Sequence, residues 1–282
     1  IEQIVPQGEG LIYTYLAAQV TERAMQHRAA GREAPLVLGL FGRAGSGKTI
    51  LAKDLSRHLA GAAAFTNTRL ISVDWFLKDR EERAAIVDRL VHPYGDDLRI
   101  YNVAPSTNDY LQLYETTRLD QLLEELKAFK ESQEAHKTIA LNDLYNPETG
   151  RKDLSVTLEL DRRSLILIEG ILAFEAGVEE DTDLFDLRLV VDAKYSTVTN
   201  RQADREPTKT RGHRYTYREL VDRLMLEHYS LGTERVDALM RAAHVDYVID
   251  TDGYETLLGK PSVRGGSGVD EIRSWVVPPE QL

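Results

Sequence analysis

The run Gly-Arg-Ala-Gly-Ser-Gly-Lys-Thr at positions 42–49 constrains the fold of this 282-residue chain more than any other segment. It fits the phosphate-binding pattern G-x-x-x-x-G-K-[ST] at every fixed position. The apolar residues 36–41 before it are typical of a short buried strand, and residues 50–60 after it place leucines on one face of a helix. A strand, a glycine-rich loop and a helix in this order predict a P-loop and an α/β fold.

The predicted loop indicates how a nucleoside triphosphate would be bound. Its glycines allow the backbone N–H groups to form a concave nest, and the helix N-terminus adds partial positive charge. Lys48 is expected to reach the β- and γ-phosphates, and the Thr49 hydroxyl is expected to bind Mg²⁺. The residues expected to hold the nucleotide here are Gly42, Gly45, Ser46, Gly47, Lys48, Thr49 and Ile50.

Composition excludes several other classes of protein. The chain has no cysteine, which rules out disulfides, thiolate metal sites and cysteine nucleophiles. Its net charge of −11 disfavours binding to nucleic acid or to an anionic membrane. No apolar run approaches the roughly 18–20 residues that a membrane helix needs, and the first residues do not resemble a signal peptide. The default interpretation is a cytoplasmic protein.

Short apolar segments alternate with helical patterns along the chain. This alternation predicts a doubly wound, mostly parallel sheet flanked by helices. Nearly continuous apolar character indicates strands that are covered on both faces. The expected strands are 36–41, 69–74, 138–142, 164–169, 187–192 and 246–250, and the expected helices are 11–28, 50–60, 119–129 and 220–231.

Two carboxylates end predicted strands at the sheet edge where the P-loop lies. Glu169 follows the apolar run 165–168, and Asp74 follows the run that begins at Arg69. The carboxyl edge of a parallel sheet is where ligands bind, so both side chains are expected to face the nucleotide. Asp74 could accept the proton of an attacking hydroxyl, or it could instead be the N-cap of the next helix.

Four segments, in order, resemble the uridine kinase and phosphoribulokinase family. They are Gly-Arg-Ala-Gly-Ser-Gly-Lys-Thr, Ser-Val-Asp-Trp-Phe, Leu-Tyr-Asn-Pro-Glu-Thr-Gly-Arg-Lys-Asp and Leu-Ile-Glu-Gly-Ile-Leu-Ala-Phe, and the likeness spans roughly residues 36–250. The last segment is especially similar to uridine–cytidine kinases. The resemblance implies that Asp74 is the general base and that Glu169, with Thr49 and Asp74, holds Mg²⁺.

The resemblance also implies substrate-side residues and a lid. Tyr145 matches a tyrosine near the nucleoside base, Asp109 an aspartate that binds the ribose hydroxyls, and Arg151 an arginine just after that tyrosine. In the arginine-rich lid, Arg201 would bind the nucleotide, Arg205 would assist phosphoryl transfer and Arg211 would bind substrate. The full set of expected substrate residues is Asp74, Phe76, Asp109, Tyr145, Arg151 and Arg211; the catalytic residues are Asp74, Lys48 and Arg205.

One P-loop kinase domain is expected to occupy residues 1–282. Its expected parts are an N-terminal helical extension (1–33), a substrate-side insertion (80–117), an arginine-rich lid (199–217) and a loosely held C-terminal tail (252–282). Family members often form dimers or tetramers, so the resemblance is compatible with a homo-oligomer.

The function predicted from the sequence is transfer of the γ-phosphate of ATP, with Mg²⁺, to a hydroxyl of a small molecule. A nucleoside 5′-hydroxyl, uridine- or cytidine-like, is the first acceptor that the resemblance implies. No histidine follows Tyr145, and Leu77 stands where that group often has tyrosine. A sugar or sugar-phosphate kinase of the phosphoribulokinase type is therefore the alternative. A catalytically silent nucleotide-binding regulator is another, and a nucleic-acid-coupled ATPase is disfavoured by the net charge.

Overall fold

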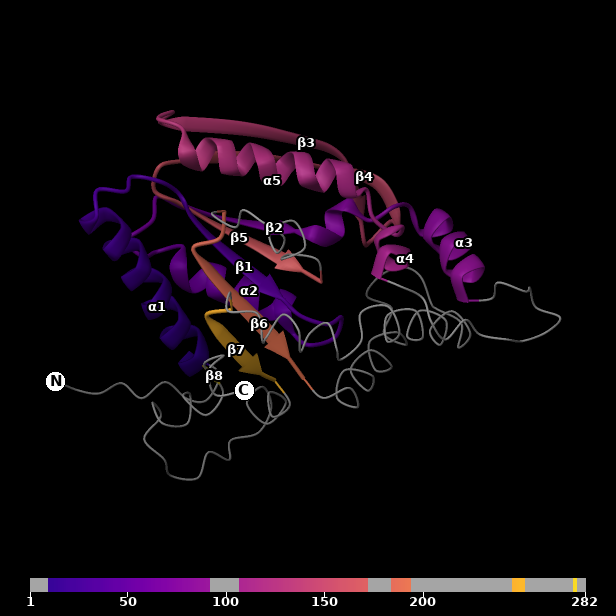
Figure 1. Cartoon of the computed structure of the whole chain (residues 1–282), viewed down its shortest axis with the longest axis horizontal. Coiled ribbons are helices and arrows are strands. Elements are labelled where there is room, and N and C mark those ends of the chain that lie inside the picture. Colours follow the sequence, from indigo (N-terminus) through magenta and orange to yellow (C-terminus); the bar gives the residue numbers. More distant parts are fainter. Residues whose placement is uncertain (1–9, 92–106, 172–183, 194–244, 252–275, 278–282) are drawn as a thin grey trace, which may run out of the picture.

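The computed structural model describes residues 10–91, 107–171, 184–193, 245–251 and 276–277. Its main feature is a six-stranded sheet with the strand order β2-β5-β1-β6-β7-β8 (Figure 1). Five strands run parallel, and β8 pairs antiparallel with β7 at the edge. The strands are β1 (Leu36–Phe41), β2 (Asn67–Ser72), β5 (Ser164–Gly170), β6 (Leu187–Asp192), β7 (Tyr247–Asp250) and β8 (Val276–Val277).

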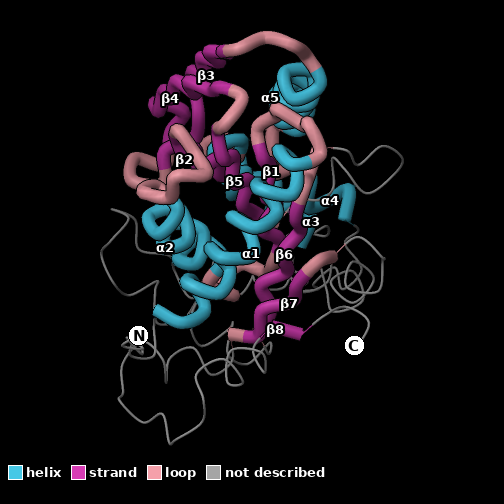
Figure 2. The backbone as a smooth tube through the Cα atoms, turned by 90° about the vertical axis from the view of Figure 1, so that its left-hand side faces the viewer, coloured by secondary structure: helices cyan, strands magenta, loops and turns pink. Residues whose placement is uncertain are grey.

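Helices cover both faces of this sheet, as Figures 1 and 2 show. All six residues of β1 are buried, and their side chains alternate between two hydrophobic clusters. Leu38 packs in the cluster that includes α1 and α2, and Val37 packs in the cluster that includes α5. The helices are α1 (Gly10–Ala29), α2 (Lys48–Leu59), α3 (Arg80–Val91), α4 (Thr107–Leu111) and α5 (Thr116–Glu131), with a short 3₁₀ helix η1 (Val73–Phe76). The predicted doubly wound fold is confirmed.

A second, two-stranded antiparallel sheet corrects one of the sequence predictions. Residues 138–142 were expected in the parallel sheet, but they lie in β3 (His136–Asn146), which pairs with β4 (Arg151–Asp161). Most side chains of β3 and β4 are exposed or half-buried, because only one face of this hairpin packs on the core. The alternation Leu154, Val156, Leu158, Leu160 is the sequence signal of such a half-covered strand.

The end of β2 is a second correction. The strand was expected to run to Asp74, but it ends at Ser72, and Asp74 lies in η1. Gly170 explains the turn, because a Cβ at that position would lie 2.5 Å from the Cβ of Val73. The missing side chain lets η1 pack against the end of β5, which brings Asp74 towards Glu169.

The structure also places elements in segments that were expected to be connections. Helix α3 and helix α4 lie within residues 80–117, and β8 lies within residues 252–282. The predicted lid (199–217) and the predicted helix 220–231 lie outside the described residues. In the part of the chain that the structure describes, no helix combines the length and apolar character needed to cross a membrane.

Candidate active site

The P-loop has the backbone conformation that the glycine pattern predicts. Gly45 and Gly47 have φ angles of 87° and 98°, in the left-handed region that favours glycine. Helix α2 begins directly after Gly47, and its first backbone bond runs from the Leu51 N–H to the Gly47 carbonyl at 3.0 Å. No side chain caps this helix, so the N–H groups of its first turn are oriented for an anionic ligand.

Neighbouring strand ends fix the position of the loop. Gly42 touches β6 so closely that a Cβ there would lie 2.2 Å from the carbonyl oxygen of Val191. Directly after β7, the hydroxyl of Thr251 donates to the carbonyl oxygen of Ser46 at 2.7 Å, and both residues are buried. The P-loop is therefore held against the carboxyl ends of β6 and β7 as well as following β1.

Lys48 and Thr49 both act at the start of α2. Lys48 is only 8% exposed, and its ammonium group donates to the Arg43 carbonyl oxygen at 3.2 Å, across the loop. Thr49 turns towards the adjacent strand, where its hydroxyl donates to Glu169 Oε2 at 3.2 Å. The two residues thus place a positive charge and a hydroxyl next to one buried carboxylate.

Glu169 is the most buried charged group of the site, at 2% exposure. Ser72, at the end of β2, donates its hydroxyl to Oε1 at 2.7 Å, while Thr49 donates to Oε2. Burial raises the pKa of Glu169, and the negative charge of Asp74 raises it further, against the opposing effects of Lys48 and the two hydroxyls. A cation at this carboxylate would relieve both causes.

These oxygen donors suit a magnesium ion. Mg²⁺ prefers hard oxygen ligands, and in phosphoryl-transfer enzymes it takes only one or two from the protein, the rest coming from phosphate and water. The Thr49 hydroxyl and the Glu169 carboxylate lie side by side next to the P-loop, and Asp74 is close enough to raise the pKa of Glu169. The donor set therefore fits the predicted Mg²⁺, and Thr49 and Glu169 are the residues that would hold it.

Asp74 stands at the opening of this site. It is exposed, and its Oδ1 accepts a hydrogen bond from the hydroxyl of Tyr114 at 3.4 Å. Tyr114 is 4% exposed, and burial raises its pKa well above the ordinary value, with added contributions from Tyr110 and Asp74. The phenol thus remains a proton donor that orients one carboxylate oxygen of Asp74.

A cation–aromatic pair lies beside Tyr114, where α3 meets the hairpin. The guanidinium carbon of Arg83 lies 4.3 Å from the ring centroid of Tyr145, and the positive charge of Arg83 acts on Tyr114 as well. The Nε of Arg83 is buried and has no hydrogen-bond partner among the described residues. Tyr145 itself is buried, at 5% exposure.

Backbone contacts join η1 to the start of α5, and an ion pair adds the hairpin. The Glu115 N–H donates to the Phe76 carbonyl at 2.7 Å, and the Lys78 N–H donates to the Leu113 carbonyl at 3.0 Å. The carboxylate of Glu115 forms ion pairs with Lys152 on β4 and with Arg118 on α5. These contacts hold this side of the site together from segments that are far apart in the sequence.

The predicted site residues divide into three groups. The structure brings Lys48, Thr49, Asp74 and Glu169 together. Four other predicted residues make no direct contact with these in the structure. Phe76 is buried in the core at 1% exposure, and the carboxylate of Asp109 on α4 accepts a hydrogen bond from Gln112. Arg151 is exposed at the start of β4, and Ile50 is 39% exposed on α2. The lid residues Arg201, Arg205 and Arg211 lie outside the described residues.

Four residues of the site were missed from the sequence. Ser72 lies within the predicted strand 69–74 and gave no signal there, because the observed strand ends earlier. Thr251 directly follows the predicted strand 246–250, and a polar residue at such a position was an available signal. Tyr114 and Arg83 carried no such signal, because their contacts depend on how α3, α4 and η1 pack.

Comparison with known proteins supports the fold. No model of a known protein family matches the chain, and no curated protein matches its sequence. Among solved structures, D-glycerate 3-kinase from Cryptococcus neoformans matches 90% of this chain and 97% of its own, with 15% identity and a TM-score of 0.50. A structure described as the YGR205w protein matches 86% of this chain and 95% of its own, with 15% identity and a TM-score of 0.53. The chain has the P-loop kinase fold that its motifs predicted.

Proposed function

We propose that this protein transfers the γ-phosphoryl group of ATP to a hydroxyl of a small molecule. The observation that carries the proposal is the contact between Thr49 and the buried Glu169, next to Lys48 and within electrostatic reach of Asp74. A phosphate-binding loop alone would support nucleotide binding only. A metal-binding pair together with an exposed carboxylate supports transfer to an acceptor.

The residues divide the work of such a reaction. The N–H groups of the P-loop and Lys48 would hold the phosphates in place and neutralise their charge. Thr49 and Glu169 would hold Mg²⁺, which when bound bridges phosphate oxygens and stabilises negative charge on them. Asp74, oriented by Tyr114, would accept the proton of the acceptor hydroxyl as its oxygen bonds to the γ-phosphorus and the bond to the leaving ADP breaks.

The acceptor side favours a molecule that carries an anionic group. Arg83 covers one face of the Tyr145 ring, which limits stacking of a nucleoside base on that ring. The same guanidinium has no ion-pair partner among the described residues, and its positive charge would attract a carboxylate or phosphate on the acceptor. This observation supports the sugar-phosphate alternative, extended to hydroxy acids, over the nucleoside; the acceptor of the structurally similar D-glycerate 3-kinase is such an acid.

The experiment that tests the function is release of ADP from ATP and Mg²⁺ with a panel of acceptors. Hydroxy acids, pentose phosphates, neutral sugars and nucleosides are each supplied to the purified chain. We expect turnover with an anionic acceptor and little with uridine or cytidine. Turnover with a nucleoside alone would refute the role given to Arg83, and ATP binding without turnover on any acceptor would favour the silent regulator.

A further inference from the structure

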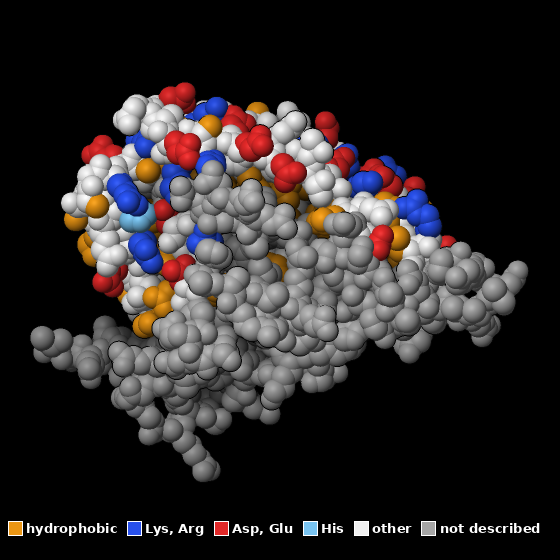
Figure 3. Space-filling view, in the orientation of Figure 1, with side chains coloured by type: hydrophobic (Ala, Val, Ile, Leu, Met, Phe, Trp, Pro, Cys, Tyr) orange, Lys and Arg blue, Asp and Glu red, His pale blue; other side chains and the backbone are white. Residues whose placement is uncertain are grey.

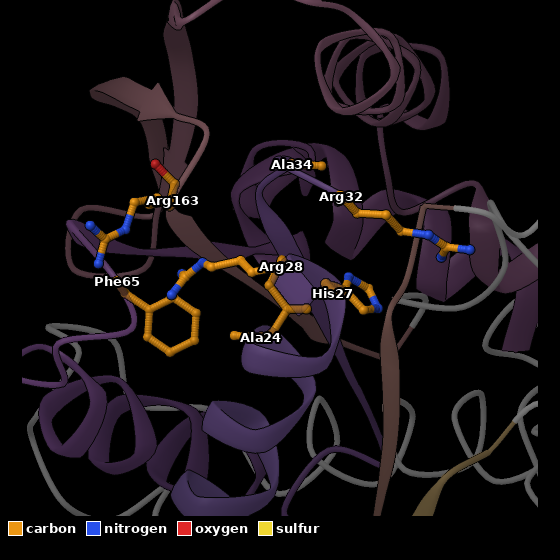
Figure 4. Close-up of a pocket in the computed structure, with 9 residues that line it drawn as sticks. Ala24, His27, Arg28, Arg32, Ala34, Phe65 and Arg163 are labelled. Carbon is orange, nitrogen blue, oxygen red and sulfur yellow. The ribbon is translucent and has the colours of Figure 1, made fainter. Parts of the chain in front are cut away.

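A small, partly open cavity lies at the edge of the sheet opposite the P-loop (Figure 4). The first residues of two strands line it, Leu36 of β1 and Ser164 of β5, whereas the P-loop and Glu169 belong to the other ends of the same strands. The end of α1 and the turn that precedes β2 complete the wall. The cavity is therefore separate from the candidate active site.

Its charged lining is entirely basic. His27, Arg28, Arg32 and Arg163 line the cavity, and no acidic residue does. In the ranges that the structure describes, none of the three arginines forms an ion pair with a carboxylate. Figure 3 shows Lys and Arg side chains with a histidine over the same end of α1. Positive charge is concentrated here on a protein whose overall charge is −11.

Two of these arginines converge although their charges repel. Arg28 comes from α1 and donates to the carbonyl of Ala64, while Arg163 comes from the turn before β5 and donates to the carbonyl of Ala63. Figure 4 shows both guanidinium groups near Phe65. Burial lowers the pKa of Arg28, and the charge of Arg163 lowers it further. Each guanidinium has five N–H donors, so one carbonyl contact leaves several unused.

A carboxylate lies near the other side of the cavity. His27 and Arg32 extend away from the arginine pair in Figure 4. The buried carboxylate of Asp186 lies 3.7 Å from His27, but it already accepts from Lys130 at 2.8 Å and from the Val37 N–H at 2.7 Å. Asp186 therefore compensates Lys130 and leaves Arg28 and Arg163 without a counter-charge of their own.

We propose that Arg28 and Arg163 bind a small oxyanion of the phosphate type, either orthophosphate or the phosphate of a monoester. Two guanidinium groups held on adjacent carbonyls present their remaining N–H donors to one ligand, and arginine suits phosphate oxygens because it donates two parallel hydrogen bonds. The bound anion removes the repulsion between the pair. It also joins the end of α1 to the start of β5, so its binding stabilises the folded chain.

The test is thermal unfolding of the full chain, saturated with ADP and Mg²⁺ so that the P-loop is filled. Orthophosphate and glycerol phosphate are each compared with chloride at equal ionic strength, which distinguishes the free ion from a monoester. We expect a saturable rise of roughly 2–4 °C in the melting temperature of the wild type. The rise is lost in Arg28→Gln and Arg163→Gln.

Arg32→Gln is the matched control, because it removes the same charge from the same cavity but from a side chain that extends away from the pair. It is expected to keep most of the rise. Each variant is measured with and without the anion. If Arg28 and Arg163 served only to bind the Ala64 and Ala63 carbonyls, their loss would lower the melting temperature equally in both conditions. If the Gln variants do not fold, Arg28→Lys and Arg163→Lys are expected to need more phosphate for the same rise, because lysine cannot donate two parallel hydrogen bonds. A rise that is equal in all variants, or absent in the wild type, overturns the proposal.

Discussion

The P-loop and the β3–β4 hairpin meet at one site, but they are held in place by different kinds of contact. The P-loop is fixed by its own glycines and by backbone contacts to the ends of β6 and β7. The hairpin is attached mainly through side chains, with Arg83 over Tyr145 and Glu115 bound to Lys152, beside one backbone bond from the Arg80 N–H to the Gly150 carbonyl. The nucleotide side is consequently set by local sequence, whereas the acceptor side can be changed by a few substitutions. The predictions below test that difference.

The largest effect is expected from Asp74→Asn, at the junction of the two regions. Loss of the proton acceptor should lower kcat by roughly 10²–10⁴-fold, because general-base catalysis contributes that much. Binding of ATP, measured by titration with a fluorescent analogue, should stay unchanged. Asp143→Asn is the control: it removes an exposed carboxylate at a φ of 52°, where asparagine fits well. Near-normal turnover of Asp74→Asn would show that Asp74 is not the base.

Glu169→Gln tests the nucleotide side. We expect kcat/KM to fall at least about 10²-fold. Loss of a residue that only hydrogen-bonds to a metal ligand already lowers activity by up to that factor, and Glu169 would bind the metal directly. The folded-state pKa of Glu169 lies above its ordinary value of 4.5, so the carboxyl loses its proton, and the apparent affinity for Mg²⁺ rises, only as the pH increases through the raised pKa. Because the folded chain holds this proton more tightly than the unfolded chain, the contribution of Glu169 to the free energy of unfolding of the metal-free chain falls as the pH rises from 4.5 through the raised pKa. Both dependences should disappear in the variant; an unchanged pH profile would contradict this assignment.

Gly42→Ala tests whether backbone packing fixes the P-loop. The added Cβ would meet the Val191 carbonyl oxygen at 2.2 Å, so we expect the free energy of unfolding to fall by about 1–3 kcal/mol, and ATP binding to weaken with it. Gly61→Ala is the matched control, because a Cβ there meets nothing within 4 Å. Urea denaturation of both variants gives the comparison, and equal stabilities would show that the contact with β6 is not restrictive.

The sequence predicted the P-loop side of the site better than the hairpin side. Lys48, Thr49 and Glu169 lie close together, as the sequence predicted, because each belongs to one continuous segment whose backbone path the motif determines. The hairpin was missed because residues 138–142 are a short apolar run, and such a run cannot be distinguished from a core strand without its partner. Tyr114 lies next to Asp74 only after α4 and η1 pack together, 40 residues apart in the chain. No local pattern contains that contact.

Arg83→Met tests the acceptor side alone. The substitution keeps an unbranched side chain over Tyr145 but removes the positive charge, so the KM for an anionic acceptor should rise roughly tenfold, the effect of losing one hydrogen bond to a charged group. The KM for ATP should stay the same, because Arg83 lies on α3 and makes no recorded contact with the P-loop. Arg89→Gln, an exposed arginine on the same helix, is the control. A rise in the KM for ATP of similar size would show that the two sides are not independent.

The smallest effect is expected from Tyr114→Phe, which removes only the hydrogen bond to Asp74. At 3.4 Å the bond is long, and a loss of about 1 kcal/mol corresponds to a fall in kcat of roughly fivefold. Tyr13→Phe is the matched control, because Tyr13 is equally buried and its hydroxyl has no partner among the described residues. Thermal unfolding of both variants is measured beside kcat. A merely structural role of Tyr114 would lower the stability of Tyr114→Phe and leave the kcat of the folded variant unchanged, so the change in kcat decides whether the acceptor side positions the base.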